Sequence, residues 1–130
     1  MKKTICMDLD GVITDYKNWY KRKENLSEAE VQFYSQKIGM IFWRLKPIEG
    51  IAEAIKELRK TYRIIIYTAR GKAFRGLTSK WLKKHNISYD RLIMNKPMAH
   101  IYIDDLAFEF KENKWDTTTI KEITEFLEHN

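Results

Sequence analysis

The sequence has few of the features that mark secreted, membrane-spanning or repetitive proteins. It has one cysteine, Cys6, which cannot form an internal disulfide. No apolar run approaches the roughly 20 residues that a membrane-spanning helix needs. No secretory signal follows the first residues, and there is no internal repeat or low-complexity stretch. We therefore expect one cytoplasmic domain over residues 1–130 with no membrane contact, and we expect Cys6 to be a small residue of the core.

Clustered metal-binding histidines are also missing. His85, His100 and His129 have no companions at the spacing of metal ligands, so we interpret them as structural or surface residues. The sequence does carry an excess of positive charge, since 24 Lys and Arg against 18 Asp and Glu give a net charge of +6. Such an excess favours anionic partners, although it commonly reflects a solvated surface alone.

Strand-like apolar segments alternate with segments of helical period along the chain. This alternation predicts an α/β fold, a Rossmann-like parallel sheet flanked by helices. The β-branched run 64–66 indicates a strand that is buried on both faces. The predicted strands cover residues 4–9, 63–68, 91–94 and 100–104.

Three helices are predicted from apolar residues at helical spacing. The third begins near Thr119, whose spacing to Glu122 fits a capping box. The apolar stripes are Ile51, Ala54, Ile55 and Leu58 in the first helix, Phe74, Leu77, Trp81 and Leu82 in the second, and Ile120, Ile123 and Leu127 in the third.

A long segment, residues 14–46, separates the first strand from the first of these helices. A direct crossover needs fewer residues, so we interpret this segment as a small helical cap folded over the carboxyl edge of the sheet. Ser27 and Glu30 fit a capping box. The apolar residues that follow at helical spacing are Val31, Tyr34, Ile38, Ile41 and Leu45.

The most informative motif, Asp8-Leu9-Asp10-Gly11, stands at the end of the first predicted strand. Residues two apart on a strand share a face, so the carboxylates of Asp8 and Asp10 project together from its carboxyl end. Ligands bind at that edge in open α/β sheets. Close like charges repel unless a cation lies between them, and Mg²⁺ prefers carboxylate oxygens. The motif therefore predicts a metal–carboxylate site with one carboxylate available as a nucleophile.

The other predicted strands also lie beside reactive side chains. Thr68 ends the second strand with a hydroxyl, and the backbone N–H groups after it can hold a phosphate oxygen. Lys96, held extended by the proline that follows, places a cation before the fourth strand. Asp104 and Asp105 form a second acidic pair where the fourth strand ends.

In this order the motifs resemble those of the haloacid dehalogenase-like superfamily of aspartate-nucleophile phosphatases. Asp8–Val12 resembles its first motif, Thr68 the second, Lys96 the third and Asp104-Asp105 the fourth. Dehalogenase members lack an acid at the position of Asp10, so its presence favours phosphoryl transfer. The resemblance covers nearly the whole chain and implies a single domain of this type.

The resemblance also implies a role for each catalytic residue. Asp8 would attack phosphorus to give an aspartyl-phosphate. Asp10 would protonate the leaving oxygen and then deprotonate the water that hydrolyses the intermediate. Thr68 and Lys96 would bind the oxygens of the transferring phosphoryl group. The predicted function is hydrolysis of a small phosphomonoester.

The cofactor that the resemblance implies is Mg²⁺. Asp8, Asp104 and the backbone carbonyl of Asp10 would ligate it, and Asp105 would act through water or steady Lys96. The residues expected to bind the substrate are Thr68, Ala69, Arg70, Lys96 and Trp43.

Two subfamilies compete for the finer match. Residues 95–97 and 102–105 resemble small phosphatases of capsular or lipopolysaccharide sugar biosynthesis. Residues 42–50 resemble 5′(3′)-deoxyribonucleotidases, which carry a small helical cap at this place. The substrate therefore stays open between a nucleoside monophosphate and a sugar phosphate.

Two further classes are alternatives. A phosphatase of nucleic-acid termini would use the basic and aromatic residues 16–23 to attract and stack a strand end. A non-catalytic phosphate-binding protein would keep the fold without turnover, but the nucleophile and the acid are both present. The sequence does not indicate an oligomeric state.

Overall fold

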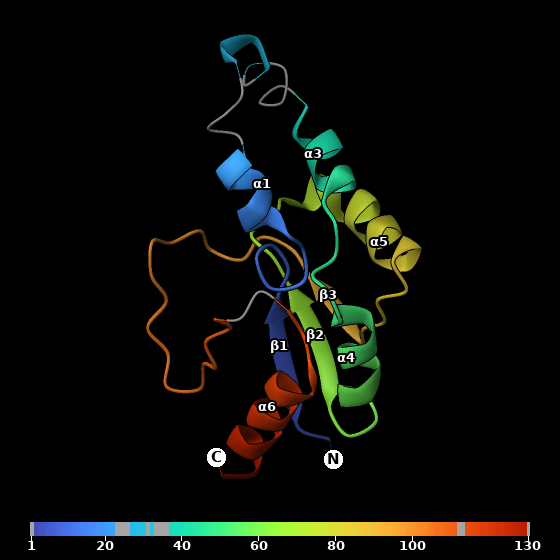
Figure 1. Ribbon diagram of the computed structural model, residues 1–130, viewed down its shortest axis with the longest axis vertical. Coiled ribbons are helices and arrows are strands. Elements are labelled where there is room, and N and C mark those ends of the chain that lie inside the picture. The colour runs from blue at the N-terminus through green and yellow to red at the C-terminus, as the bar shows by residue number, and fades with distance from the viewer. Residues whose placement is uncertain (1, 23–26, 31, 33–36, 112–113, 130) are drawn as a thin grey trace.

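The computed structural model describes residues 2–22, 27–30, 32, 37–111 and 114–129. In this part of the chain three parallel strands form a sheet in the order β1 (Thr4–Asp8), β2 (Arg63–Tyr67) and β3 (Arg91–Ile93). Asp8 pairs with Tyr67, and Tyr67 pairs with Ile93, so the three strands end at one edge. With helices around this sheet, the predicted α/β Rossmann-like fold is confirmed (Figure 1).

The helices that flank the sheet are α4 (Ile51–Leu58), α5 (Arg75–Lys84) and α6 (Thr117–His129), and a short 3₁₀ helix, η2 (Lys72–Phe74), leads into α5. Helix α4 packs against β2 and α6. Its predicted apolar stripe is confirmed, since all four residues are at most 2% exposed. Burial of each aliphatic side chain contributes about 1.5–3 kcal/mol. The sheet is therefore held to α4 mainly by the hydrophobic effect.

The last helix begins earlier than the sequence predicts. Asp116, not Thr119, caps it: Oδ1 of Asp116 accepts the backbone N–H of Thr119 at 2.9 Å and the Thr119 hydroxyl at 3.2 Å. The backbone N–H of Thr119 lowers the pKa of Asp116, since it stabilises the charged carboxylate. The capping box with Glu122 is wrong because Thr119 already lies inside the helix, where it is buried.

Trp115, just before α6, makes hydrogen bonds to two residues that are far from it in the sequence. Its backbone N–H donates to the carbonyl of Glu49 at 2.8 Å, and its indole Nε1 donates to the carbonyl of Val12 at 2.8 Å. Gly50 has φ +85°, and a Cβ at this position would lie 1.9 Å from the Trp115 carbonyl oxygen. Glycine at position 50 is therefore required for this close approach.

The segment after β1 contains the helices α1 (Tyr16–Arg22) and α3 (Ile38–Arg44), which lie beyond the carboxyl ends of the strands (Figure 1). Its two ends are joined, because the backbone N–H of Asp15 donates to the carbonyl of Lys46 and the Asp15 carboxylate accepts the N–H of Lys46. A buried cluster of Ile41, Phe42 and Leu45 packs against Tyr16, Trp19, Phe74 and Leu77. Through this cluster α3 packs against η2 and α5.

Other expectations for this segment have mixed outcomes. The capping box is confirmed, since the backbone N–H of Glu30 donates to the Ser27 hydroxyl and the N–H of Ser27 donates to the Glu30 carboxylate. Ile38 is 45% exposed and is not part of the buried stripe. Val31 and Tyr34 lie outside the described residues.

The predicted fourth strand, residues 100–104, is wrong. Residues 98–108 run away from the sheet as an exposed excursion, drawn in orange in Figure 1. Local bonds compete with strand pairing here: the Tyr102 hydroxyl donates to the Pro97 carbonyl, and the N–H of Leu106 donates to the Asp104 carboxylate. Within the described ranges β1 consequently has a neighbour on one side only.

The exposed position of Cys6 differs from the expectation. The cysteine was expected in the core, but it lies on the surface of the edge strand β1. None of the described helices is long and apolar enough to cross a membrane.

Candidate active site

Asp8 is the last residue of β1, at the edge where the three strands end. Its Oδ1 accepts the backbone N–H of Leu9 at 2.8 Å, and its Oδ2 lies 3.9 Å from Nζ of Lys96. Burial raises the pKa of Asp8 above its ordinary value, although the Lys96 charge and the Leu9 N–H oppose that shift. The side chain is 39% exposed, so a substrate can reach it from solvent.

A tight turn after Asp8 carries Asp10. The carbonyl of Leu9 accepts the N–H groups of Ile13 and Thr14 at 2.8 and 3.0 Å, and Gly11 has φ +91°. A Cβ on Gly11 would lie 3.2 Å from Cε of Lys17 as well as straining the backbone. Glycine at position 11 therefore sets the path that returns the chain over the end of β1.

Lys96 is fixed to the end of β2 by its backbone, because its N–H donates to the carbonyl of Thr68 at 2.8 Å. Its Nζ lies 4.2 Å from the ring centroid of Tyr67 and 4.1 Å from that of Tyr102. Burial alone would lower the pKa of Lys96, but the interaction with Tyr67 and the charge of Asp8 outweigh it and raise the pKa. Lys96 is therefore a stable cation beside Asp8.

Thr68 is 1% exposed and lies immediately beyond β2. Its Oγ1 accepts the backbone N–H of Arg70 at 3.1 Å. The hydroxyl keeps its own hydrogen to donate, and a phosphate oxygen could accept it. Ala69, between these two residues, is exposed at the same strand end.

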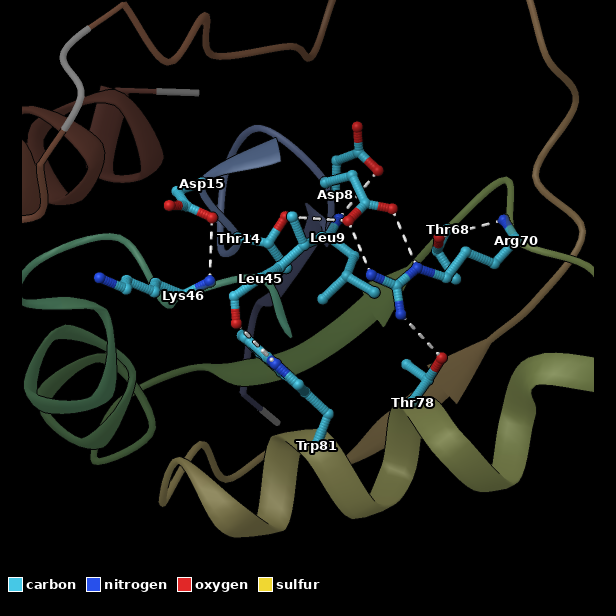
Figure 2. Close-up of polar contacts among 11 residues, drawn as sticks. Asp8, Leu9, Thr14, Asp15, Leu45, Lys46, Thr68, Arg70, Thr78 and Trp81 are labelled. Carbon is cyan, nitrogen blue, oxygen red and sulfur yellow. Dashed lines mark hydrogen bonds and ion pairs between the residues drawn. The ribbon is translucent and has the colours of Figure 1, made fainter. Parts of the chain in front are cut away.

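Asp10 and Arg70 form a two-pronged ion pair. Nη2 of Arg70 lies 2.8 Å from Oδ1 of Asp10, and Nε of Arg70 lies 3.0 Å from Oδ2. The Thr14 hydroxyl also donates to Oδ1 at 2.9 Å. Figure 2 shows Arg70 reaching from the end of β2 toward Thr78 on α5, whose Oγ1 accepts from Nη1 at 3.1 Å. Asp10 is thus held by three donors.

Arg70 was expected either to bind the substrate or to form a surface salt bridge, and here it forms a salt bridge that is buried on the Arg70 side. The side chain of Arg70 is 2% exposed, and Nε, Nη1 and Nη2 each donate to a protein oxygen. No local pattern indicates this partner, because Asp10 and Arg70 are 60 positions apart.

Trp43, which was expected to bind the substrate, packs against Lys84 of α5. Its ring lies 4.9 Å from Nζ of Lys84 in the last turn of α5. Lys84 is about 9 Å along the helix from Thr78, the residue that Arg70 binds. Phe42, its neighbour on α3, instead lies over Arg70, with 3.8 Å between its ring centroid and Cζ.

The predicted magnesium ligands are not brought together. Asp104 and Asp105 are exposed in the excursion 98–108, whereas Asp8 and Asp10 lie at the end of β1. In the part of the chain that the structure describes, no three Asp, Glu, His or Cys side chains form a cluster that could hold a metal ion. Of the four expected ligands, only Asp8 and Asp10 therefore lie at the strand end.

Three residues that support the Asp10–Arg70 pair and Lys96 were not predicted from the sequence. Thr14 and Thr78 are completely buried and hold the Asp10–Arg70 pair, and Tyr67 covers Lys96. Only Thr78 gave a signal, since its position lies on the predicted inward face of the helix with Trp81 and Leu82.

Comparisons with known proteins give structural neighbours only. A scan against protein-family models and a search of curated proteins gave no match. A Vibrio cholerae protein of known crystal structure has a TM-score of 0.60 at 21% identity, over 98% of this chain and 99% of its own. A chain of a Pnkp1/Rnl/Hen1 complex has a TM-score of 0.47 at 23% identity, over 80% of this chain and 30% of its own.

A Thermotoga maritima protein assigned as a β-phosphoglucomutase has a TM-score of 0.48 at 14% identity, over 72% of this chain and 61% of its own. This chain thus spans less than two thirds of this protein and of the Pnkp1/Rnl/Hen1 chain. The Vibrio cholerae structure shows that the α/β fold is shared along the full length of both chains. A likeness at this identity establishes the fold and leaves the function to the site.

Proposed function

We propose that this protein is a haloacid dehalogenase-like phosphatase that hydrolyses a small phosphomonoester through an aspartyl-phosphate on Asp8. The observation that carries the proposal is the pairing of Asp8 with Lys96 across 3.9 Å at the carboxyl edge of the sheet. A half-buried carboxylate that solvent can reach, beside a half-buried cation, can attack phosphorus while the cation neutralises the phosphoryl oxygens.

The proposed reaction has two steps. In the first, an oxygen of Asp8 bonds to phosphorus, the ester P–O bond breaks, and the departing oxygen takes a proton from Asp10. In the second, the ionised Asp10 takes a proton from water, the water oxygen bonds to phosphorus, and the bond between phosphorus and Asp8 breaks. Inorganic phosphate leaves, and Asp8 and Asp10 return to their starting states.

Lys96 and Thr68 would position the phosphoryl group. The N–H of Lys96 donates to the carbonyl of Thr68. This backbone hydrogen bond therefore holds together the two residues that carry the ammonium and the hydroxyl. Most of the catalysis in phosphoryl transfer comes from such positioning and from charge stabilisation.

We also propose that activity requires Mg²⁺, as expected from the acidic motifs. Support comes from Asp8, whose exposed carboxylate at the strand end has oxygens of the kind that Mg²⁺ prefers. Asp104 would have to approach the free edge of β1 to join it.

The substrate class is proposed from the position of the inserted helices. Helices α1 and α3 lie beyond the strand ends, where they would contact the leaving group of a bound ester (Figure 1). A nucleoside monophosphate and a sugar phosphate both remain candidates, because the contact of Trp43 with Lys84 does not favour base stacking at Asp8.

The test is a phosphate-release screen over nucleoside monophosphates, sugar phosphates and nitrophenyl phosphate. Wild type is compared with Asp8→Asn, in which a neutral amide replaces the nucleophile. Release by wild type that is absent from the variant supports the proposal. Equal release by the two proteins, or none from any ester, refutes it.

A further inference from the structure

Arg70 lies where the inserted helices meet Asp10. Three of its nitrogens donate to oxygen atoms: Nε and Nη2 to the carboxylate of Asp10, and Nη1 to Thr78 on α5. A guanidinium that binds both oxygens of a carboxylate fixes the plane of that carboxylate as well as its distance. The side chain of Asp10 is 21% exposed, against 2% for Arg70, so solvent reaches the pair from the Asp10 side.

The guanidinium is covered by a residue of the inserted segment. The ring of Phe42 on α3 lies 3.8 Å from Cζ of Arg70, and it packs edge-to-face on Phe74 with 5.2 Å between the ring centroids. A cation over an aromatic face is attracted to it, and more strongly when desolvated. The position of α3 therefore determines where the guanidinium plane lies.

These contacts form a continuous path from α3 to the end of β1. Phe42 contacts Arg70, and Arg70 holds Asp10, which follows Asp8 by two residues. An error of about 1 Å in the position of a catalytic group can cost about 100-fold in rate. A shift of α3 that tilts the guanidinium would therefore move the carboxylate of Asp10 and change the reaction rate.

We propose, on the basis of the function proposed above, that Arg70 is a positioning residue for Asp10. Through Phe42, the orientation of Arg70 then depends on how α3 packs. The inserted helices then do more than cover the site. They control whether the carboxylate of Asp10 points at the leaving oxygen.

The choice of substrate separates this role from phosphate binding. Proton donation by Asp10 matters for an alkyl phosphate such as glycerol phosphate, whose alkoxide is a poor leaving group, and matters little for nitrophenyl phosphate. We expect Arg70→Gln to lower kcat for glycerol phosphate by about 10- to 100-fold, with about a 3-fold loss or less for nitrophenyl phosphate. KM should change by less than about 2-fold, since Arg70 does not touch the substrate.

Arg70→Lys keeps the positive charge, but an ammonium cannot bind both oxygens of the Asp10 carboxylate as the planar guanidinium does, so we expect the same selective loss. Equal losses for the two substrates, or a loss that appears in KM, would overturn the positioning role.

The coupling to α3 is tested with Phe42→Leu and a control on the same helix, Ile38→Ala. Phe42 is 7% exposed and lies over Arg70, whereas Ile38 is 45% exposed and lies outside the buried cluster of α3. Phe42→Leu should reproduce the selective loss for glycerol phosphate, and Ile38→Ala should not. In the Arg70→Gln background Phe42→Leu should add less than about 2-fold, because the path is already broken.

If the effects of Phe42→Leu and Arg70→Gln multiply, or if Ile38→Ala gives the same selectivity, the coupling is refuted. Thermal unfolding of each variant checks folding. Phe42→Leu keeps both partners of the ion pair, so it tests the path even if Arg70→Gln does not fold. Absence of any turnover by wild type would instead refute the proposed phosphatase, which is a separate outcome.

Discussion

Nζ of Lys96 lies 3.9 Å from Oδ2 of Asp8, near enough for electrostatic attraction but too far for a hydrogen bond. The ammonium is held instead between the rings of Tyr67 and Tyr102. It can therefore donate to an incoming phosphoryl oxygen without first breaking a hydrogen bond to Asp8.

Lys96→Ala should weaken substrate binding and turnover together, because one charge serves both the ground state and the transition state. A hydrogen bond from a charged group contributes about 1.5–3 kcal/mol, so kcat/KM should fall by about 10- to 150-fold. Steady-state kinetics with nitrophenyl phosphate measures this, with Lys80→Ala on the exposed face of α5 as the control. A change in thermal stability alone would make Lys96 a structural residue.

Asp8→Asn and Asp10→Asn should have opposite effects on stability at neutral pH. The raised pKa of Asp8 means that its ionised form opposes folding, so an amide should leave the melting temperature unchanged or higher. Asp10→Asn replaces one of the two oxygens that accept from the buried Arg70 with an NH₂ group, and the unsatisfied donor should cost about 1–3 kcal/mol. Thermal unfolding monitored by circular dichroism compares the two variants.

The pH dependence of the Asp8 effect has a definite sign. A carboxyl group whose folded-state pKa is raised destabilises the fold increasingly as pH rises from the ordinary value of 3.8 through the folded-state pKa. Wild type and Asp8→Asn should therefore be equally stable at the acid end of this range and diverge above it. Melting curves without added metal that diverge in the opposite direction would contradict the assignment.

A chelator should abolish phosphate release, and Mg²⁺ should restore it. Ca²⁺ should inhibit, because its larger and looser coordination disturbs in-line geometry. Asp104→Asn should raise the Mg²⁺ concentration needed for half-maximal activity, whereas Glu109→Gln, in the same part of the chain, should not. Full activity in excess chelator would exclude the magnesium requirement.

Trp43→Ala should lower kcat/KM to the same small extent for the best natural substrate and for nitrophenyl phosphate, within about 2-fold, because Trp43 stacks on Lys84 at an exposed site. If Trp43 stacked on a nucleobase, the loss would be about 5- to 150-fold and confined to nucleotides. A selective loss of that size would return Trp43 to the substrate site.

The layout of the strand ends was predictable because parallel strands bring their carboxyl ends to one edge wherever they pair. Asp8 and Thr68 each follow a β-branched or apolar run, and pairing of β1 with β2 leaves them side by side. Local sequence was also sufficient for the buried stripe of α4 and for the Ser27–Glu30 box, since both depend on neighbours within one or two turns.

The ion pair of Asp10 with Arg70 could not be predicted in the same way. It depends on how η2 and α5 approach the turn at Gly11, which no local pattern encodes. The segment 100–104 has the composition of a strand, yet side-chain bonds from Tyr102 and Asp104 to nearby backbone compete with pairing. Apolar composition alone could not decide whether residues 100–104 form a paired strand or an exposed loop.

The bonds of Trp115 to Val12 and Glu49 have a consequence for the order in which parts of the protein fold during synthesis. The sheet and α5 use residues up to position 93, so they can form while Trp115 is still inside the ribosome. The turn that carries Asp10, however, receives the indole of Trp115 only after that residue has emerged. A nascent chain would therefore fold its scaffold first and gain an ordered catalytic turn last.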